Sequence, residues 1–168
     1  MDLLGNKVGL IEKIDCGNFM KQKNKILVSA CLAGVKCRYN GTDAFNEKIL
    51  KEMRNAELVI VCPELLGGEP IPRPACNIDQ LDGHAVLAGK AKIMGIDGKD
   101  YTESYVRGAK KALEIALANN VKKAYLKSKS PTCGCGKIFD SKGENLKVGN
   151  GIFAALLIEN GIEVVSLD

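Results

Sequence analysis

Three cysteines stand at the ends of predicted strands, and their thiols are the groups in this sequence best suited to chemistry. Cys31 and Cys62 end two short apolar runs, and Cys133 lies in the loop after a third. In an open parallel sheet, ligands bind outside the carboxyl ends of the strands, where the strand order reverses. Thiols that three strands deliver to one edge of a sheet therefore predict a metal centre.

The number and type of these ligands narrow the choice of metal. Three thiolates without an obvious fourth ligand suit an iron–sulfur cluster with one open iron, or a catalytic zinc ion with one open position. Catalytic zinc usually recruits imidazole or carboxylate, whereas clusters favour thiolates. The chain has one histidine, His84, which we interpret as a loop or surface residue, so the cluster is favoured. The alternative is that these cysteines pack in the core as small hydrophobic side chains.

One carboxylate follows the second of these cysteines. Glu64 lies two residues after Cys62, across Pro63, at the predicted end of a strand. An acid beside thiols in such a position is placed for general-base catalysis. The alternative is an ordinary solvated loop acid, which is the commoner state of a glutamate.

Hydroxyl and glycine residues near these positions are candidates for substrate binding. A serine hydroxyl donates to a substrate or caps a turn. Glycines allow close backbone approach, and free N–H groups at a helix start can hold an anion or a carbonyl oxygen. The candidates are Ser29, Ser130, Gly67, Gly68, Gly149 and Gly151.

The composition is that of an ordinary soluble globular protein. The 168 residues are 46% hydrophobic and 26% charged, which fits one domain and excludes disorder as the main state. No apolar run approaches the ~20 residues that a membrane helix needs. The net charge of +4 is mild, and the charges are mixed along the chain. This permits an anionic ligand without indicating a large nucleic-acid surface.

The cysteine count bears on the compartment. Seven cysteines cannot all pair within one chain, and residues 1–24 contain no clean apolar core of a secretory signal. Both features predict reduced thiols in the cytoplasm, where cysteine clusters indicate metal binding or catalysis. Residues 1–24 show no strong period and are predicted to be an N-terminal extension of unknown role. Residues 25–168 are predicted to form the α/β domain.

Short apolar strands alternate with helices along residues 25–168. The predicted strands are 26–28, 58–62, 123–127 and 163–166, and the predicted helices are 43–55, 104–119 and 152–160, the first two capped by Asp43 and Thr102. Residues 67–76 hold two glycines and three prolines and predict an irregular loop. Small hairpins are expected at 91–101 and 138–148. This alternation predicts a single compact α/β domain with a mostly parallel, Rossmann- or flavodoxin-like sheet flanked by helices.

Five segments in fixed order resemble the thiouracil desulfidase family, over about residues 25–168. They are SACLAGVKCRYNG, VCPELLGGEPIPRPAC, YTESYVRGAKKAL, LKSKSPTCG and GNGIFAALLIENGI. Several motifs in order are far more specific than any one of them. The resemblance implies a [4Fe-4S] cluster held by three cysteines, with the fourth iron open to the substrate's sulfur. It also implies non-redox conversion of thiolated uracil, as free base or nucleoside, to uracil and hydrogen sulfide.

Carried over by motif, the resemblance assigns roles to single residues. It places the cluster ligands at Cys31, Cys62 and Cys133. It makes Glu64 the residue that activates water and Ser130 the residue that assists it. Cys135 competes with Cys133 as a ligand, and no role is assigned to Cys16, Cys37 or Cys76.

Other functions remain open at the level of the sequence. Some relatives in the family act on thiouridine in tRNA, although no long basic second domain is present here. A metalloenzyme acting on another small molecule is a further alternative, because a fold does not set the substrate. A non-catalytic carrier of sulfide or of a cluster is another alternative, as is a module that binds nucleobases.

Overall fold

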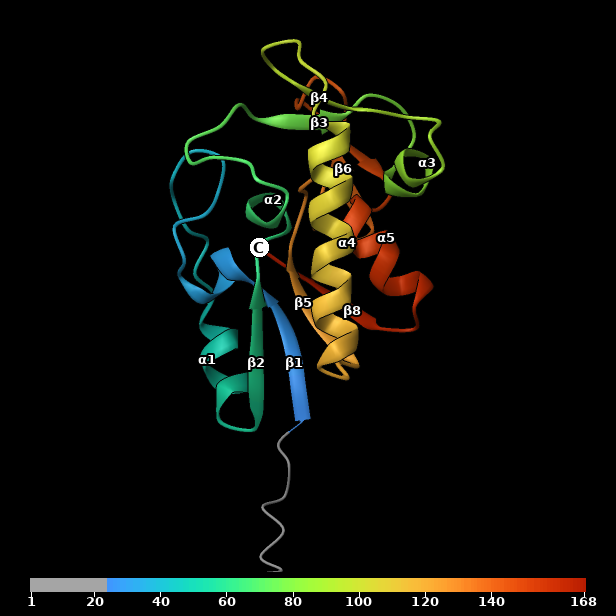
Figure 1. Cartoon of the computed structure of the whole chain (residues 1–168). Helices are drawn as coiled ribbons and strands as arrows, with labels where there is room; N and C mark the ends of the chain where they lie inside the picture. The colour runs from blue at the N-terminus through green and yellow to red at the C-terminus, as the bar shows by residue number, and fades with distance from the viewer. Residues whose placement is uncertain (1–23) are drawn as a thin grey trace, which may run out of the picture.

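A four-stranded parallel sheet forms the centre of the molecule (Figure 1). The computed structural model describes residues 24–168, so the predicted extension lies outside the described residues except for Asn24, which begins the first strand. The strands are β1 (Asn24–Ser29), β2 (Ala56–Val61), β5 (Lys123–Lys127) and β8 (Glu163–Leu167), in the order β2-β1-β5-β8. All three neighbouring pairs are parallel. The predicted fold class is confirmed.

Three helices make the crossovers between these strands. They are α1 (Glu47–Met53) between β1 and β2, α4 (Thr102–Ala118) between β2 and β5, and α5 (Ile152–Glu159) between β5 and β8. The chain first moves from β1 to β2 on one side and then returns to β5 on the other side of β1. The strand order therefore reverses between β1 and β5, and ligands bind at such a reversal.

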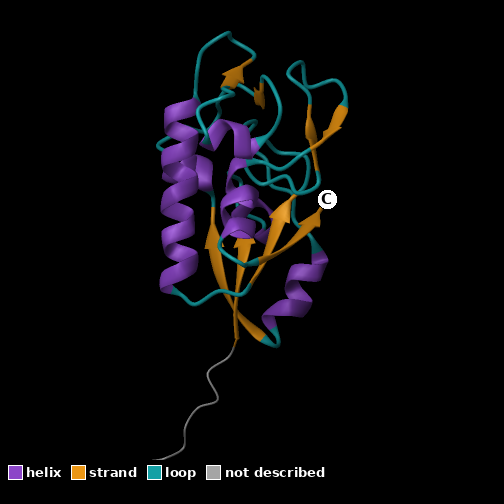
Figure 2. Cartoon of the chain, turned by 90° about the vertical axis from the view of Figure 1, so that its right-hand side faces the viewer, coloured by secondary structure: helices purple, strands orange, loops and turns teal. Residues whose placement is uncertain are grey.

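The two faces of the sheet pack against different helices (Figure 2). Successive side chains of a strand point to opposite faces. Leu27 of β1 accordingly packs in the core shared with α4 and α5, whereas Ile26 and Val28 pack in the core that includes Ile49 of α1. Both cores consist mainly of buried side chains, and their packing fixes the sheet and the loops that leave its carboxyl edge.

Two small antiparallel hairpins lie beyond that edge. Strand β3 (Cys76–Ile78) pairs with β4 (Ile93–Gly95), and β6 (Lys137–Phe139) pairs with β7 (Leu146–Val148). The second hairpin confirms the prediction for 138–148. The first differs from the prediction for 91–101, because that segment supplies β4 and its partner strand comes from residues 76–78. The irregular segment before β3 is confirmed over residues 67–75.

Some helix boundaries differ from the sequence prediction. Asp43 does not cap α1, because its carboxylate accepts a hydrogen bond from the Phe45 N–H (3.0 Å) and closes a turn instead. Asn46 is the N-cap, and its side chain accepts from the Lys48 N–H at 3.0 Å. Thr102 is the first residue of α4 and not its cap.

Three short helices were not predicted. They are the 3₁₀ helix η1 (Ala30–Ala33), α2 (Pro63–Leu66) and α3 (Gly83–Leu87). Proline is favoured in the first turn of a helix, and Pro63 begins α2. Within residues 24–168, no helix has both the length and the apolar character needed to cross a bilayer.

Candidate active site

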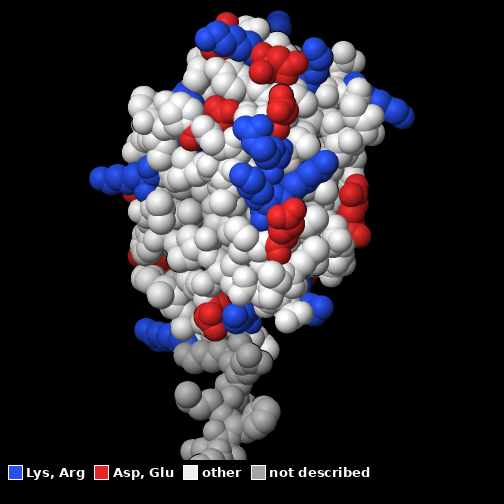
Figure 3. Space-filling model, in the orientation of Figure 1, with Lys and Arg blue, Asp and Glu red and all other residues white. Residues whose placement is uncertain are grey.

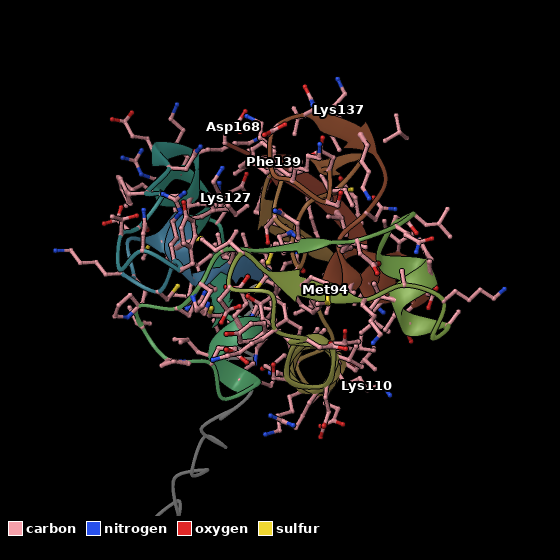
Figure 4. All side chains as sticks on the ribbon, turned by 90° about the horizontal axis from the view of Figure 1, so that it is seen from above. Met94, Lys110, Lys127, Lys137, Phe139 and Asp168 are labelled. Carbon is pink, nitrogen blue, oxygen red and sulfur yellow. The ribbon has the colours of Figure 1, made fainter. Side chains whose placement is uncertain are left out.

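A cavity of about 490 Å³ opens at the carboxyl edge of the parallel sheet. Its wall is built by residues that follow β1, β2 and β5 and by residues of both hairpins. Figure 4 views the molecule from this end. The volume lies in the range of pockets that enclose small ligands, roughly 300–1,000 Å³. The cavity therefore stands where the fold predicts a ligand.

Five cysteines line this cavity, and the three predicted ligands are among them. Cys31 lies in η1 directly after β1, Cys62 is the N-cap of α2 directly after β2, and Cys133 follows β5. The other two are Cys37 and Cys76. Cys135 is not on the wall and packs against the core that includes α4 and α5. Its position favours Cys133 as the ligand of this pair.

Cys37 is a thiol that the sequence did not distinguish. It lies within hydrogen-bonding reach of the thiols of both Cys31 and Cys62, and the bond with Cys31 contributes most to raising the pKa of Cys37 to about 11. The bond with Cys37, followed by burial, raises the pKa of Cys62. Burial also raises the pKa of Cys133. The raised pKa values of Cys37, Cys62 and Cys133 favour the protonated thiols, and binding a metal displaces such protons.

The donor set on the cavity wall is rich in thiols, the ligands that an iron–sulfur cluster requires. Within residues 24–168, no group of three or more His, Cys, Asp or Glu side chains is arranged to hold a metal ion. A cluster binds each thiolate to a different iron, so its ligands stand farther apart than those of a zinc ion. Cys31, Cys62 and Cys133 lie in three loops on one cavity wall, where each thiolate would bind a different iron. His84 lies elsewhere, on α3, with its Nδ1 2.8 Å from Glu159 Oε1.

Glu64 lines the same cavity from the first turn of α2. Its Oε1 accepts a hydrogen bond from the Thr132 hydroxyl at 3.0 Å. Its Oε2 accepts from the Arg73 guanidinium in an ion pair. The sequence predicted that Glu64 lies beside the thiols, but it did not predict Thr132 or Arg73 as partners of its carboxylate. Both contacts join segments that are distant in sequence.

Arg73 is the buried counter-ion of the site. Its side chain is 1% exposed, and that of Glu64 is 17% exposed. Burial alone would lower the pKa of Arg73, but the Glu64 carboxylate raises it, so the guanidinium stays charged. Further bonds to the carbonyls of Cys37 (3.0 Å) and Pro70 (3.2 Å) fix its position. The sequence signal for this role of Arg73 was its place among three prolines, which stiffen the loop that holds it.

Replacing Arg73 with methionine should destabilise the protein strongly. Arg73→Met leaves the Glu64 carboxylate without its counter-ion, with only the Thr132 hydroxyl still bonded to it, and breaking such a pair costs about 3 kcal/mol or more of unfolding free energy. Urea denaturation of the metal-free protein measures this loss. The double variant Arg73→Met/Glu64→Gln should recover part of it, because no charge is then left unpaired. A single variant within about 0.5 kcal/mol of the wild type would contradict this account.

The two serines organise the loop that carries Cys133. Ser130 lines the cavity, and its Oγ accepts from the N–H groups of Thr132 (3.0 Å) and Cys133 (3.1 Å). Ser29 also lines the cavity, accepts from the Lys127 N–H at 3.1 Å, and hydrogen-bonds the thiol of Cys133. Neither bond of Ser130 uses its hydroxyl hydrogen, which is therefore free to be donated toward the cavity.

The four glycines proposed as substrate contacts are not on the cavity wall. A Cβ at Gly67 would lie 2.2 Å from the Ser104 carbonyl oxygen, and one at Gly151 would lie 2.5 Å from that of Thr132, so both are required for packing. The first N–H groups of α5, which the sequence left free for a ligand, donate to the carbonyls of Pro131 and Thr132. Gly68 closes α2 through a bond to Leu65, and Gly149 lies against Asp82. The geometry thus gives Gly67, Gly68, Gly149 and Gly151 packing or turn roles, and their contact with a substrate stays a prediction.

Basic side chains also line the cavity: Arg38, Lys127, Lys129 and Lys142. Lys127 and Lys129 form ion pairs with Asp168, whose Oδ1 lies 2.9 Å from Lys129 Nζ and 3.6 Å from Lys127 Nζ. Lys127 and Asp168 stand close together at the rim (Figure 4). The rim is thus basic but partly neutralised.

The face over α4 has mixed charge. Figure 3 shows a group of basic side chains there with acidic ones on either side. The basic residues Arg107, Lys110 and Lys111 line a shallow groove that also contains Glu103 and Glu114. This face is no extended basic surface.

The chain is similar to known proteins over almost all of its described residues. The model of the 2-thiouracil desulfurase family matches residues 26–168. The YbbK protein of Bacillus subtilis (strain 168) is 45% identical over 142 residues, which are 84% of this chain and 94% of YbbK. Among solved structures, the [4Fe-4S]-dependent thiouracil desulfidase TudS superposes with a TM-score of 0.73 at 34% identity, covering 86% of this chain and 91% of TudS.

Proposed function

Because the chain belongs to the 2-thiouracil desulfurase family, we propose that it removes sulfur from a thiolated uracil with the help of a [4Fe-4S] cluster. In this reaction, water replaces the sulfur of the thiocarbonyl group, and the products are uracil and hydrogen sulfide. No electrons are gained or lost overall. The substrate is a small thiolated pyrimidine, as free base or nucleoside.

One observation carries the proposal: thiols from the ends of three parallel strands line a cavity that also holds a carboxylate. Cys31, Cys62 and Cys133 would hold the cluster there. When bound, the cluster supplies a Lewis-acidic iron for the soft thiocarbonyl sulfur. The similarity to a [4Fe-4S]-dependent desulfidase supports this choice of cofactor.

The side chains of the cavity supply the remaining chemistry. Glu64 accepts a proton from the water that attacks the ring carbon, which is general-base catalysis. Arg73 and Thr132 occupy one lone-pair direction on each carboxylate oxygen, and about two directions stay open for that proton. Ser130 assists by donating its free hydroxyl hydrogen toward the substrate.

An assay of sulfide release tests the proposal. The protein is purified and reconstituted without oxygen, its iron is counted, and it is mixed with 2-thiouracil. We expect about four irons per chain, as in a cubane cluster, and equal amounts of uracil and hydrogen sulfide without added reductant. Loaded protein that binds thiouracil but releases no sulfide would favour a carrier or a nucleobase-binding module.

A thiouridine in tRNA is the second candidate substrate, and the basic residues of the cavity wall favour it. The mixed charge of the α4 face does not extend that basic surface (Figure 3). Competition between 2-thiouracil and thiolated tRNA in the same assay decides between them. Turnover of tRNA would weaken steeply with added salt, because phosphate contacts release counterions.

A further inference from the structure

Both oxygens of the Glu64 carboxylate are held, and the two bonds come from different loops. Arg73 holds Oε2 from the segment before β3. Thr132 holds Oε1 from the loop after β5, with its hydroxyl 3.0 Å away. Thr132 is fully buried. Its hydroxyl is therefore shielded from water and directed at one acceptor.

Thr132 itself has little freedom to move. Its N–H donates to Ser130 Oγ at 3.0 Å, and its carbonyl accepts from the Phe153 N–H at 2.9 Å, in the first turn of α5. Gly151 packs so closely that a Cβ there would lie 2.5 Å from the Thr132 carbonyl. These contacts hold the backbone from which the hydroxyl projects, so Thr132 sets the position and Glu64 adapts to it.

We propose that Thr132 is the positioning residue that sets the orientation of Glu64 in the cavity, an inference that rests on the proposed role of Glu64 as proton acceptor. The bond from Arg73 alone leaves the carboxylate free to rotate about the oxygen it holds. A second bond to the other oxygen removes that freedom. The water-activating oxygen is then held at a constant place relative to the loop that carries the adjacent Cys133.

The substitution that tests this role is isosteric. Thr132→Val keeps the shape of the side chain and removes its hydroxyl, and Thr132→Ser keeps the hydroxyl. With 2-thiouracil as substrate, Thr132→Val should lower kcat about ten-fold and change KM less than about two-fold, because a misplaced base slows chemistry rather than binding. Thr132→Ser should stay within about two-fold of the wild-type kcat. Equal losses in both variants would overturn the proposal.

A double-mutant cycle separates positioning from a general effect on the fold. If Thr132 acts through Glu64, adding Thr132→Val to Glu64→Gln should lower kcat no further, because contacting residues are not additive. An additive ten-fold loss would show that Thr132 acts by another route and would overturn the proposal. Iron content should be the same in all variants.

Crystal structures of the metal-free variants give a readout that needs no activity. In Thr132→Val, the Glu64 carboxylate should turn away from its wild-type orientation, and in Thr132→Ser it should keep it. A carboxylate that keeps its place in Thr132→Val would overturn the proposal. Loaded wild-type protein that released no sulfide would instead refute the proposed function, and these structures would still decide whether Thr132 orients Glu64.

Discussion

Each of the variants Cys31→Ala, Cys62→Ala and Cys133→Ala should contain less than about one iron per chain after reconstitution, against about four in the wild type. Loss of one thiolate leaves a cluster with two protein ligands and a second exposed iron. Activity should fall with the iron, below detection. Iron and acid-labile sulfide are measured after anaerobic reconstitution, and far-UV circular dichroism shows that each variant is folded.

Two other cysteines, one outside the cavity and one inside it, provide controls for this experiment. Cys135→Ala should keep its iron, because Cys135 is not on the wall. Cys37→Ala is the sharper control, since this thiol lies in the cavity and hydrogen-bonds both Cys31 and Cys62. Loss of iron from Cys37→Ala, with retention in one of the three ligand variants, would mean that the ligands are wrongly assigned. If Cys31→Ala keeps iron and Cys31→Ala/Cys37→Ala loses it, Cys37 has replaced the missing ligand.

Glu64→Gln should lower kcat by about 10²–10⁴-fold while leaving iron content and visible absorbance unchanged. The glutamine amide has the same shape and can still accept from Arg73 and bond Thr132, but it cannot take up a proton from water. Steady-state release of sulfide from 2-thiouracil measures the effect. KM should change far less than kcat, because the base acts in the chemical step.

A matched carboxylate gives the control for this variant. Glu103 lies on α4 with its side chain 95% exposed and outside the cavity, so Glu103→Gln should have wild-type kcat. If Glu64→Gln kept kcat within about two-fold of the wild type, Glu64 would be only the buried partner of Arg73 and not the base. The free energy of unfolding of Glu64→Gln would then still be lower than that of the wild type, because the ion pair with Arg73 is lost.

Local patterns in the sequence were sufficient for much of the fold. Short apolar runs predicted all four strands of the parallel sheet. In the central strands β1 and β5, burial on both faces makes this run continuous. Helical spacing located α4 and α5 within a few residues. Boundaries were less certain wherever a side chain bonded its own backbone: Asp43 closes a turn and leaves the cap of α1 to Asn46.

The sequence by itself determined that Cys31, Cys62, Glu64 and Cys133 follow parallel strands and so meet at one edge of the sheet. Only the tertiary structure decided which other side chains join them. Arg73 and Thr132 reach Glu64 from separate loops, Cys37 enters the cavity and Cys135 does not. The first N–H groups of α5 donate hydrogen bonds to the carbonyls of Pro131 and Thr132 and are not free for a ligand. Strand and helix periodicity is local, whereas such contacts depend on the paths of irregular loops, which no period encodes.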